Sequence, residues 1–404
     1  MVALWSAFVV VHVVIAAAGW LYPSQPMGDV VLVYEPWSTA ALSGGAIVGI
    51  TEPWVYPQLA LVPMLVAKVL STPLIAAMGA SEAYLIAWAV LVTVLDAIAF
   101  AVLLGRASSR PRRAAAWFWV AALLLLGPIA MYRIDAVTVP IAVIGGLWLV
   151  RRPATAAALL TIGAWIKIWP GALVLAAVVA TTSRMRMLLT AAAVSAGVVA
   201  LLFLLGADTE IFGFLTEQTG RGLQIEAVAA TPFLWLAVSG AARIEYSFDI
   251  LTFQIGAQGA DAVSAVLTPL MVVLVVVLTA IGSLKAARGA PSARLFPPLA
   301  LSLVTTLIVM NKVGSPQFQT WLIAPVILWF VLDRARVVGP AVLVLALCAL
   351  TCLVYPLSYD ALLRAELLPI VILTARNALL VVLLAVGIRA VVGVPTHRPS
   401  TTRE

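Results

Sequence analysis

The residues of this chain that could do chemistry are a few carboxylates and cations set between long apolar stretches. Asp29 lies in the segment GDVVLVYEPW, directly after the first apolar stretch, and Tyr34 and Glu35 follow it. A carboxylate held at a membrane surface can deprotonate a sugar hydroxyl, because partial desolvation makes it a stronger base. The alternative is a solvated acidic residue beside the start of a helix. Asp29 is therefore a candidate general base.

Two cations break apolar segments further along the chain. Arg133 lies in the short turn Tyr-Arg-Ile-Asp, where its planar guanidinium can bind a phosphate or simply neutralise Asp135. Lys167, in WIKIWP, stands between two short apolar halves and precedes Pro170. A charged residue at such a break is typical of a discontinuous helix that lines a cavity, and the alternative is a lysine that snorkels to the interface.

Two polar segments in the second half of the chain are further candidates for substrate contacts. The segment QTGRGLQIEAVAATP contains Arg221, Gln224 and Glu226, and the glycines beside Arg221 let the backbone approach a ligand closely. The segment NKVGSPQFQTW places Lys312 and Gln317 in a tight turn between two apolar stretches. Both segments are predicted to face the same compartment as the loop that follows the first apolar stretch.

Other kinds of site find no support in the sequence. The chain has two histidines, His12 and His397, and neither a phosphate-binding P-loop nor a GxGxxG strand–helix motif. We therefore expect no metal and no cofactor. Two cysteines four residues apart in an apolar run are expected to be small helical side chains. Asp96 and Arg376 lie inside apolar stretches, where they can pair as a structural bridge.

The elements that position these residues must be membrane helices. Of the 404 residues, 64% are hydrophobic and 10% are charged, whereas soluble domains carry about 25% charged residues. A lipid bilayer as solvent explains this deficit. The net charge of +7 is expected to orient the chain in the membrane and not to bind nucleic acid. The preference for arginine over lysine, with spans rich in Ala, Val and Leu, indicates a GC-rich bacterial genome and hence the bacterial plasma membrane.

Apolar stretches of about 17–25 residues, with a few shorter ones, give the expected spans. They are 3–21, 82–105, 114–131, 136–150, 154–166, 168–182, 187–206, 262–284, 295–311, 318–332, 337–357 and 366–388. The sequence thus predicts an all-α integral membrane protein, a single polytopic domain over 1–404 with about 12 transmembrane helices.

Basic clusters between the spans predict the orientation of the chain. Placing them on the cytoplasmic side leaves both termini inside, with the tail 389–404, and puts two long loops, 22–81 and 207–261, outside. This topology requires that the apolar segments 57–78 and 232–242 do not cross. The first contains three prolines and a lysine and the second is short, so we expect interfacial or re-entrant helices on the outer face.

These motifs, in this order, resemble the GT-C superfamily of polytopic glycosyltransferases, and most closely glycosyltransferase family 87, an actinobacterial mannosyltransferase-like group. The similarity covers essentially the whole chain as architecture. It is carried by the acidic first outer loop with Asp29, the Tyr-Pro step at 56–57, the KIWP step at 167–170, the RGLQIE segment and the KVGSPQ turn.

The resemblance implies an inverting transfer of a sugar, expected to be mannose, from a polyprenyl-phosphate donor to a lipid-linked or glycan acceptor on the extracytoplasmic face, without a metal. By position Asp29 is then the base. Many GT-C members carry paired acidic residues in this loop, whereas here Glu35 is six residues away and could share or replace that role. We expect substrate contacts from Tyr34, Arg133, Asp135, Lys167, Arg221, Gln224, Glu226, Lys312 and Gln317.

Two other classes of protein compete with this interpretation. A transporter or lipid flippase often shows repeated halves and broken helices at mid-membrane, but no repeat is visible and the charges gather toward one face. A non-catalytic scaffold subunit would not need cations opposite an acidic loop. The expected partners are the lipid-linked donor, the acceptor and membrane lipids, with no nucleic acid.

Overall fold

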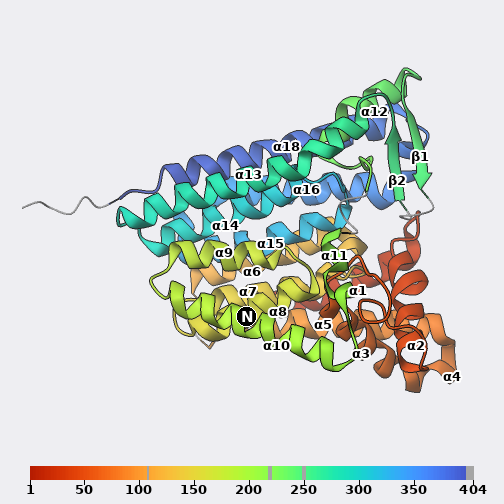
Figure 1. The fold of residues 1–404 in the computed structure, drawn as a ribbon, viewed down its shortest axis with the longest axis horizontal. Coiled ribbons are helices and arrows are strands. Elements are labelled where there is room, and N and C mark those ends of the chain that lie inside the picture. Colours follow the sequence, from red (N-terminus) through yellow and green to blue (C-terminus); the bar gives the residue numbers. More distant parts are fainter. Residues whose placement is uncertain (107–108, 217–220, 248–251, 397–404) are drawn as a thin grey trace, which may run out of the picture.

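The protein is a bundle of helices with one small hairpin, as the computed structural model shows over residues 1–106, 109–216, 221–247 and 252–396 (Figure 1). The helices are α1 (Val2–Leu21), α2 (Glu35–Leu42), α3 (Leu61–Ser71), α4 (Ile75–Met78), α5 (Ala80–Leu104), α6 (Arg110–Leu126), α7 (Asp135–Trp148), α8 (Pro153–Ile166), α9 (Pro170–Ala180), α10 (Arg184–Leu204), α11 (Gly213–Thr216), α12 (Thr231–Val238), α13 (Ala260–Ala287), α14 (Ser292–Val309), α15 (Ile323–Leu332), α16 (Val338–Cys352), α17 (Tyr359–Leu363) and α18 (Leu367–Val392). The antiparallel strands are β1 (Arg243–Ser247) and β2 (Thr252–Gly256).

Every apolar stretch predicted to span the membrane coincides with helical structure. Within the described ranges, nine helices are long and apolar enough to cross a membrane, so the chain is a multi-pass membrane protein. The nine include Gln58–Met78, which the sequence analysis kept out of the membrane. Four predicted spans correspond to shorter apolar helices, α7, α8, α9 and Pro316–Leu332. The described residues also contain a hairpin, which the all-α prediction missed.

Glycine and proline set several helix ends. Gly79, between α4 and α5, and Gly105, which ends α5, both adopt positive φ, a conformation that other residues disfavour. Pro111 stands in the first turn of α6 and Pro170 opens α9. Proline suits this position because the first helical N–H groups have no partner within the helix.

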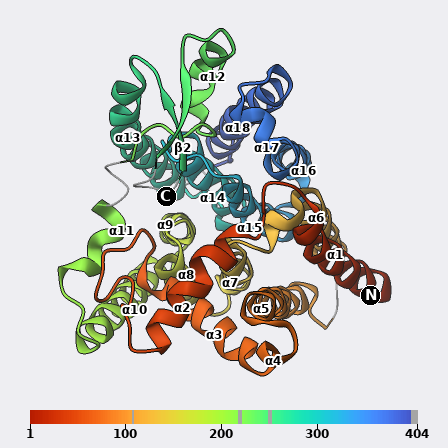
Figure 2. The same ribbon diagram turned by 90° about the vertical axis from the view of Figure 1, so that its right-hand side faces the viewer.

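The long helices run along the long axis of the bundle, and the irregular segments gather at one end (Figure 1). We call the end that carries α2, α3, α4, α11, α12 and the hairpin the loop end; it lies at the right in Figure 1 and faces the viewer in Figure 2. The C-terminal end of α18 lies at the opposite end (Figure 1). In Figure 2, α5 is seen nearly end-on, whereas α3 and α4 run across the view.

Two apolar clusters pack the bundle around the polar residues of the loop end. The main core runs through α1 and α5–α9 and continues through α14–α16 and α18. A second cluster includes Leu223, Ile225, Ile255, Ile370 and Leu373 and packs the segment 221–230 and the hairpin onto α18. The second cluster therefore fixes the segment 221–230 and the hairpin at the loop end, close to the polar residues described next.

Candidate functional site

Asp29 and Arg133 form an ion pair at the loop end. Asp29 directly precedes the helical turn Val30–Tyr34, and Arg133 lies in the turn before α7. Arg133 Nη1 lies 2.9 Å from Asp29 Oδ1; the Arg133 side chain is 8% exposed and the Asp29 side chain 38%. Arg133 Nη2 donates a hydrogen bond of 2.9 Å to Tyr355 Oη. A fixed, buried guanidinium thus lies beside a carboxylate that solvent can reach.

A second ion pair, Asp135 with Lys167, lies deeper. Asp135 opens α7 and its side chain is 0% exposed, while Lys167 is 13% exposed and lies in extended backbone between α8 and α9. Trp321 Nε1 donates a hydrogen bond to Asp135 Oδ1. Lys167 Nζ is 3.9 Å from Asp135 Oδ2 and 4.3 Å from the centre of the Tyr56 ring. Lys167 and Asp135 therefore form an ion pair without a direct hydrogen bond.

Electrostatics join the two pairs into one site. Burial lowers the pKa of Lys167, while the charges of Asp135 and Asp29 raise it and those of Arg221 and Arg133 lower it. We call Asp29, Arg133, Asp135 and Lys167 the charged cluster.

Two tyrosines line the charged cluster. Tyr34 Oη accepts a hydrogen bond of 3.2 Å from the backbone N–H of Ile134, which lies between Arg133 and Asp135. Burial, followed by the charge of Asp29, raises the pKa of Tyr56, so its phenol stays protonated at neutral pH. The site is therefore a mixture of paired charges and neutral hydroxyl groups.

The segment 221–230 lies near this cluster and is fixed by its own contacts. The backbone N–H of Gln224 donates a 3.0 Å hydrogen bond to the carbonyl of Lys312. Glu226 Oε2 accepts a hydrogen bond of 2.6 Å from Arg376 Nη1, and the Glu226 carbonyl accepts one of 2.7 Å from Arg376 Nη2. Asn377 Oδ1 also accepts from this guanidinium. Glu226 thus anchors this segment to α18.

The predicted pairing of Asp96 with Arg376 is wrong. Arg376 pairs with Glu226 at the loop end, and Asp96 Oδ2 lies 3.2 Å from His12 Nε2, between α1 and α5. Each charge found a nearer partner, because unpaired burial of a charge costs several kcal/mol, on the order of 3–5. The sequence distance between Glu226 and Arg376, 150 residues, hides this pairing from sequence analysis.

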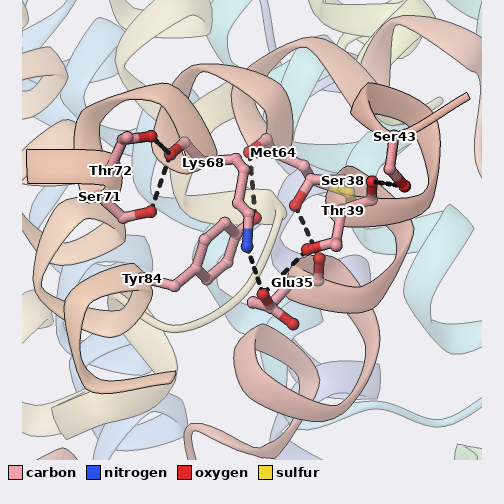
Figure 3. A network of polar contacts seen from close by, with 9 residues as sticks. All are labelled: Glu35, Ser38, Thr39, Ser43, Met64, Lys68, Ser71, Thr72 and Tyr84. Atoms are coloured by element: carbon pink, nitrogen blue, oxygen red, sulfur yellow. Dashed lines mark hydrogen bonds and ion pairs between the residues drawn. The ribbon is translucent and has the colours of Figure 1, made fainter. Parts of the chain in front are cut away.

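Glu35 points into a separate network between α2 and α3 (Figure 3). Its Oε1 accepts hydrogen bonds from Lys68 Nζ and, at 2.9 Å, from Thr39 Oγ1. Tyr84 Oη, on α5, donates to the Met64 carbonyl on α3 in the same region. Glu35 is therefore occupied in tying α2 to α3, whereas Asp29 belongs to the charged cluster.

The remaining predicted residues occupy the border of the site. Lys312 and Gln317 are buried, each with 7% of the residue exposed, and burial lowers the pKa of Lys312. The charge of Arg133 also acts on Glu226, so the segment 221–230 lies within electrostatic reach of the charged cluster. The structure therefore brings Asp29, Arg133, Asp135, Lys167 and Tyr34 together, with Arg221 near enough to act on the charge of Lys167. Gln224 is joined to Lys312 and Glu226 to α18, while Gln317 is buried in the helical turn Pro316–Leu322.

Sequence reasoning missed Tyr355 and Trp321, and it noted Tyr56 only for its place in a motif. Aromatic residues near the ends of membrane helices are common, so their positions carry little signal. A tryptophan indole N–H buried in an apolar segment does need an acceptor, which was a usable hint for Trp321. In the described part of the chain, no group of three or more His, Cys, Asp or Glu residues could hold a metal ion.

The chain was compared with protein-family models, with curated protein sequences and with solved structures. None of the three comparisons finds a match. The site geometry and the sequence therefore carry the functional argument.

Proposed function

We propose that this protein is a membrane glycosyltransferase of the GT-C type. It moves a sugar, expected to be mannose, from a polyprenyl-phosphate donor to a lipid-linked or glycan acceptor. The observation that carries the proposal is the Asp29–Arg133 pair: a solvent-accessible carboxylate 2.9 Å from a buried guanidinium, at the loop end of a membrane bundle. The chemistry needs a base and a phosphate-binding cation side by side.

The reaction is a single displacement with inversion. An acceptor hydroxyl gives its proton to Asp29 while its oxygen attacks the anomeric carbon of the donor sugar. The bond from that carbon to the phosphate oxygen breaks, and its electron pair stays on the polyprenyl phosphate. Arg133 stabilises the charge that develops on this leaving group. Nη1 of Arg133 has no aligned hydrogen-bond acceptor among the described residues, so it can turn to a phosphate oxygen.

The proposal includes a membrane arrangement. The loop end is extracytoplasmic, both termini are cytoplasmic, and the short helices α7, α8 and α9 cross as parts of a 12-span bundle in a bacterial plasma membrane. α3 then lies in the outer interface. Its side chains Val62, Val66, Val69 and Leu70 are exposed, which suits an amphipathic helix whose apolar face contacts lipid and guides the donor tail.

The test is sugar transfer by purified protein in lipid, with labelled polyprenyl-phosphate mannose and a membrane-lipid extract. Asp29→Asn should lower the rate by about 10²–10⁴-fold, which is the range that general base catalysis supplies. Glu35→Gln is the matched control, because it also removes one carboxylate of the first outer loop. It should keep transfer within about threefold of wild type, as expected for a surface-type pair.

Three outcomes would contradict parts of the proposal. Full activity of Asp29→Asn with loss in Glu35→Gln would move the base to Glu35. Wild-type activity in both variants would exclude a carboxylate base in this loop. Movement of labelled lipid between leaflets without any transfer, in wild type, would replace the enzyme by a flippase.

A further inference from the structure

We propose that Asp135 and Lys167 form a subsite that binds one hydroxyl group of the donor sugar, so that they select the sugar and leave the phosphate to Arg133. The inference deepens the proposed function and rests on it, because it takes a sugar lipid as the ligand. It assigns the sugar and the phosphate of the donor to different side chains.

The distance between the two side chains carries the inference. Lys167 Nζ and Asp135 Oδ2 are 3.9 Å apart, which is too long for a hydrogen bond. Asp135 Oδ2 is buried and has no hydrogen-bond partner in the portion of the chain that is described. A hydroxyl group donates one hydrogen bond and accepts another. Placed between them, it accepts from Nζ and donates to Oδ2, and thereby completes both groups.

The pair is held in place by neighbouring side chains. Trp321 Nε1 donates to Asp135 Oδ1, and the Trp321 ring stacks on Trp169 with centroids 6.1 Å apart. Trp169 Nε1 in turn donates to Thr138 Oγ1 at 2.9 Å, one turn along α7 from Asp135. Such support keeps Oδ2 pointing in one direction before the ligand arrives, which is what a selective polar contact needs.

The charges assign different tasks to Lys167 and Arg133. Asp135, fully buried, opposes the charge of Lys167, and the Tyr56 ring lies on another side of the ammonium group. The counter-ion of Arg133 is the exposed Asp29, which can swing away when an anion binds. A phosphate therefore gains more by joining Arg133, while a neutral hydroxyl fits beside the Asp135–Lys167 pair without an added charge.

The experiment measures the binding of two lipids to the purified full-length protein: polyprenyl phosphate without a sugar, and polyprenyl-phosphate mannose. Asp135→Asn is the decisive variant. Its amide oxygen can still accept from Trp321, but its NH₂ group cannot accept the sugar hydroxyl proton. Mannosyl-lipid affinity should fall by about tenfold or more. Affinity for the bare lipid phosphate should stay unchanged or rise, because a negative charge is removed.

Three further variants complete the design. Lys167→Met should lower mannosyl-lipid affinity by about tenfold or more and affect the bare lipid less, within about threefold. Arg133→Gln should weaken both lipids alike. Lys285→Met is the matched control: this lysine lies in the last turn of α13 and bonds the carbonyl of Val394. It should change neither affinity. Thermal unfolding of each variant shows whether the fold is kept.

Each result decides a different statement. If Asp135→Asn binds both lipids as well as or better than wild type, Asp135 acts only through its charge and the hydroxyl subsite is refuted. If Lys167→Met lowers the affinity for both lipids equally, Lys167 binds the phosphate and not the sugar. If wild type binds neither lipid, the proposed function fails and this inference falls with it. If wild type binds the bare lipid and Asp135→Asn loses only the mannosyl lipid, both stand.

Discussion

Two buried ion pairs at the loop end differ in how completely their atoms are satisfied. Glu226 and Arg376 are 3% and 2% exposed, and the guanidinium donates to the Glu226 carboxylate, to its carbonyl and to Asn377. The Asp135 side chain is 0% exposed and that of Lys167 is 13% exposed, yet Lys167 Nζ and Asp135 Oδ2 are 3.9 Å apart. The first pair, which we call closed, has its charged atoms hydrogen-bonded. The second, which we call open, leaves Asp135 Oδ2 without a hydrogen-bond partner among the described residues.

This difference separates a structural role from a binding role. A closed pair offsets its desolvation with several hydrogen bonds and fixes one backbone arrangement, as Glu226 does for the segment 221–230 on α18. An incomplete pair is stable only because its surroundings hold it, and a ligand with a suitable hydroxyl improves it. Burial alone therefore does not identify a functional charge, whereas burial with an unused hydrogen-bonding atom does.

The largest expected effect is on the closed pair. Arg376→Met leaves Glu226 buried without its partner, and should lower the free energy of unfolding by about 3–5 kcal/mol. Thermal unfolding in a mild detergent gives the direction, and denaturant titration gives the size.

The double variant Glu226→Gln with Arg376→Met tests the reason for that loss. It no longer buries an unpaired charge, so it should recover part of the stability lost in Arg376→Met. A double variant as unstable as the two single losses added together would show that the pair does not act as a unit. Glu226–Arg376 would then no longer serve as the example of a structural ion pair to compare with Asp135–Lys167.

The helices of this fold were readable from the sequence, because lipid demands long apolar segments and satisfied backbone groups. Composition and length therefore predicted the positions of the long apolar helices, although Gln58–Met78, which is long and apolar enough to cross a membrane, was predicted to stay outside it. The hairpin of β1 and β2 was missed, since its two short strands are held by pairing and by the second apolar cluster, which are decided in three dimensions. Crossing by α7, α8 or α9 stays a prediction, because helices packed inside protein need not match the bilayer thickness.

The candidate site was predictable for charges and not for their partners. Arg133 and Lys167 were found because a cation in an apolar segment is costly and needs a reason. Tyr355 lies 222 residues from Arg133, and Trp321 lies 186 residues from Asp135. Contacts at such separations depend on how the helices pack. For the same reason Arg376 was assigned to the wrong carboxylate.

A smaller effect is expected in the pH dependence of the open pair. Because burial lowers the pKa of Lys167 below that of an ordinary lysine, its ammonium form is lost at a lower alkaline pH. Mannosyl-lipid affinity should then fall by up to about tenfold per pH unit above that pKa. The folded state binds fewer protons than the unfolded state in this window, so the contribution of Lys167 to stability rises with pH.

Binding and stability should therefore move in opposite directions, which separates titration of Lys167 from alkaline unfolding. Binding by Lys167→Met, measured over the same range, should be weaker and lack this alkaline decline. A decline that persists in Lys167→Met would assign it to another group, and the nearby tyrosines Tyr34 and Tyr56 titrate later because burial raises the pKa of each.

The smallest effect is expected for the third ion pair, Glu35 with Lys68 (Figure 3). Its side chains are 17% and 15% exposed, so water screens them more than it screens Glu226 and Arg376. A double-mutant cycle with Glu35→Gln and Lys68→Met should give a coupling of about 0.2–1 kcal/mol. A coupling as large as that of Glu226 and Arg376 would mean that α2 and α3 depend on this contact. Neither degree of exposure nor the number of hydrogen bonds would then rank these pairs.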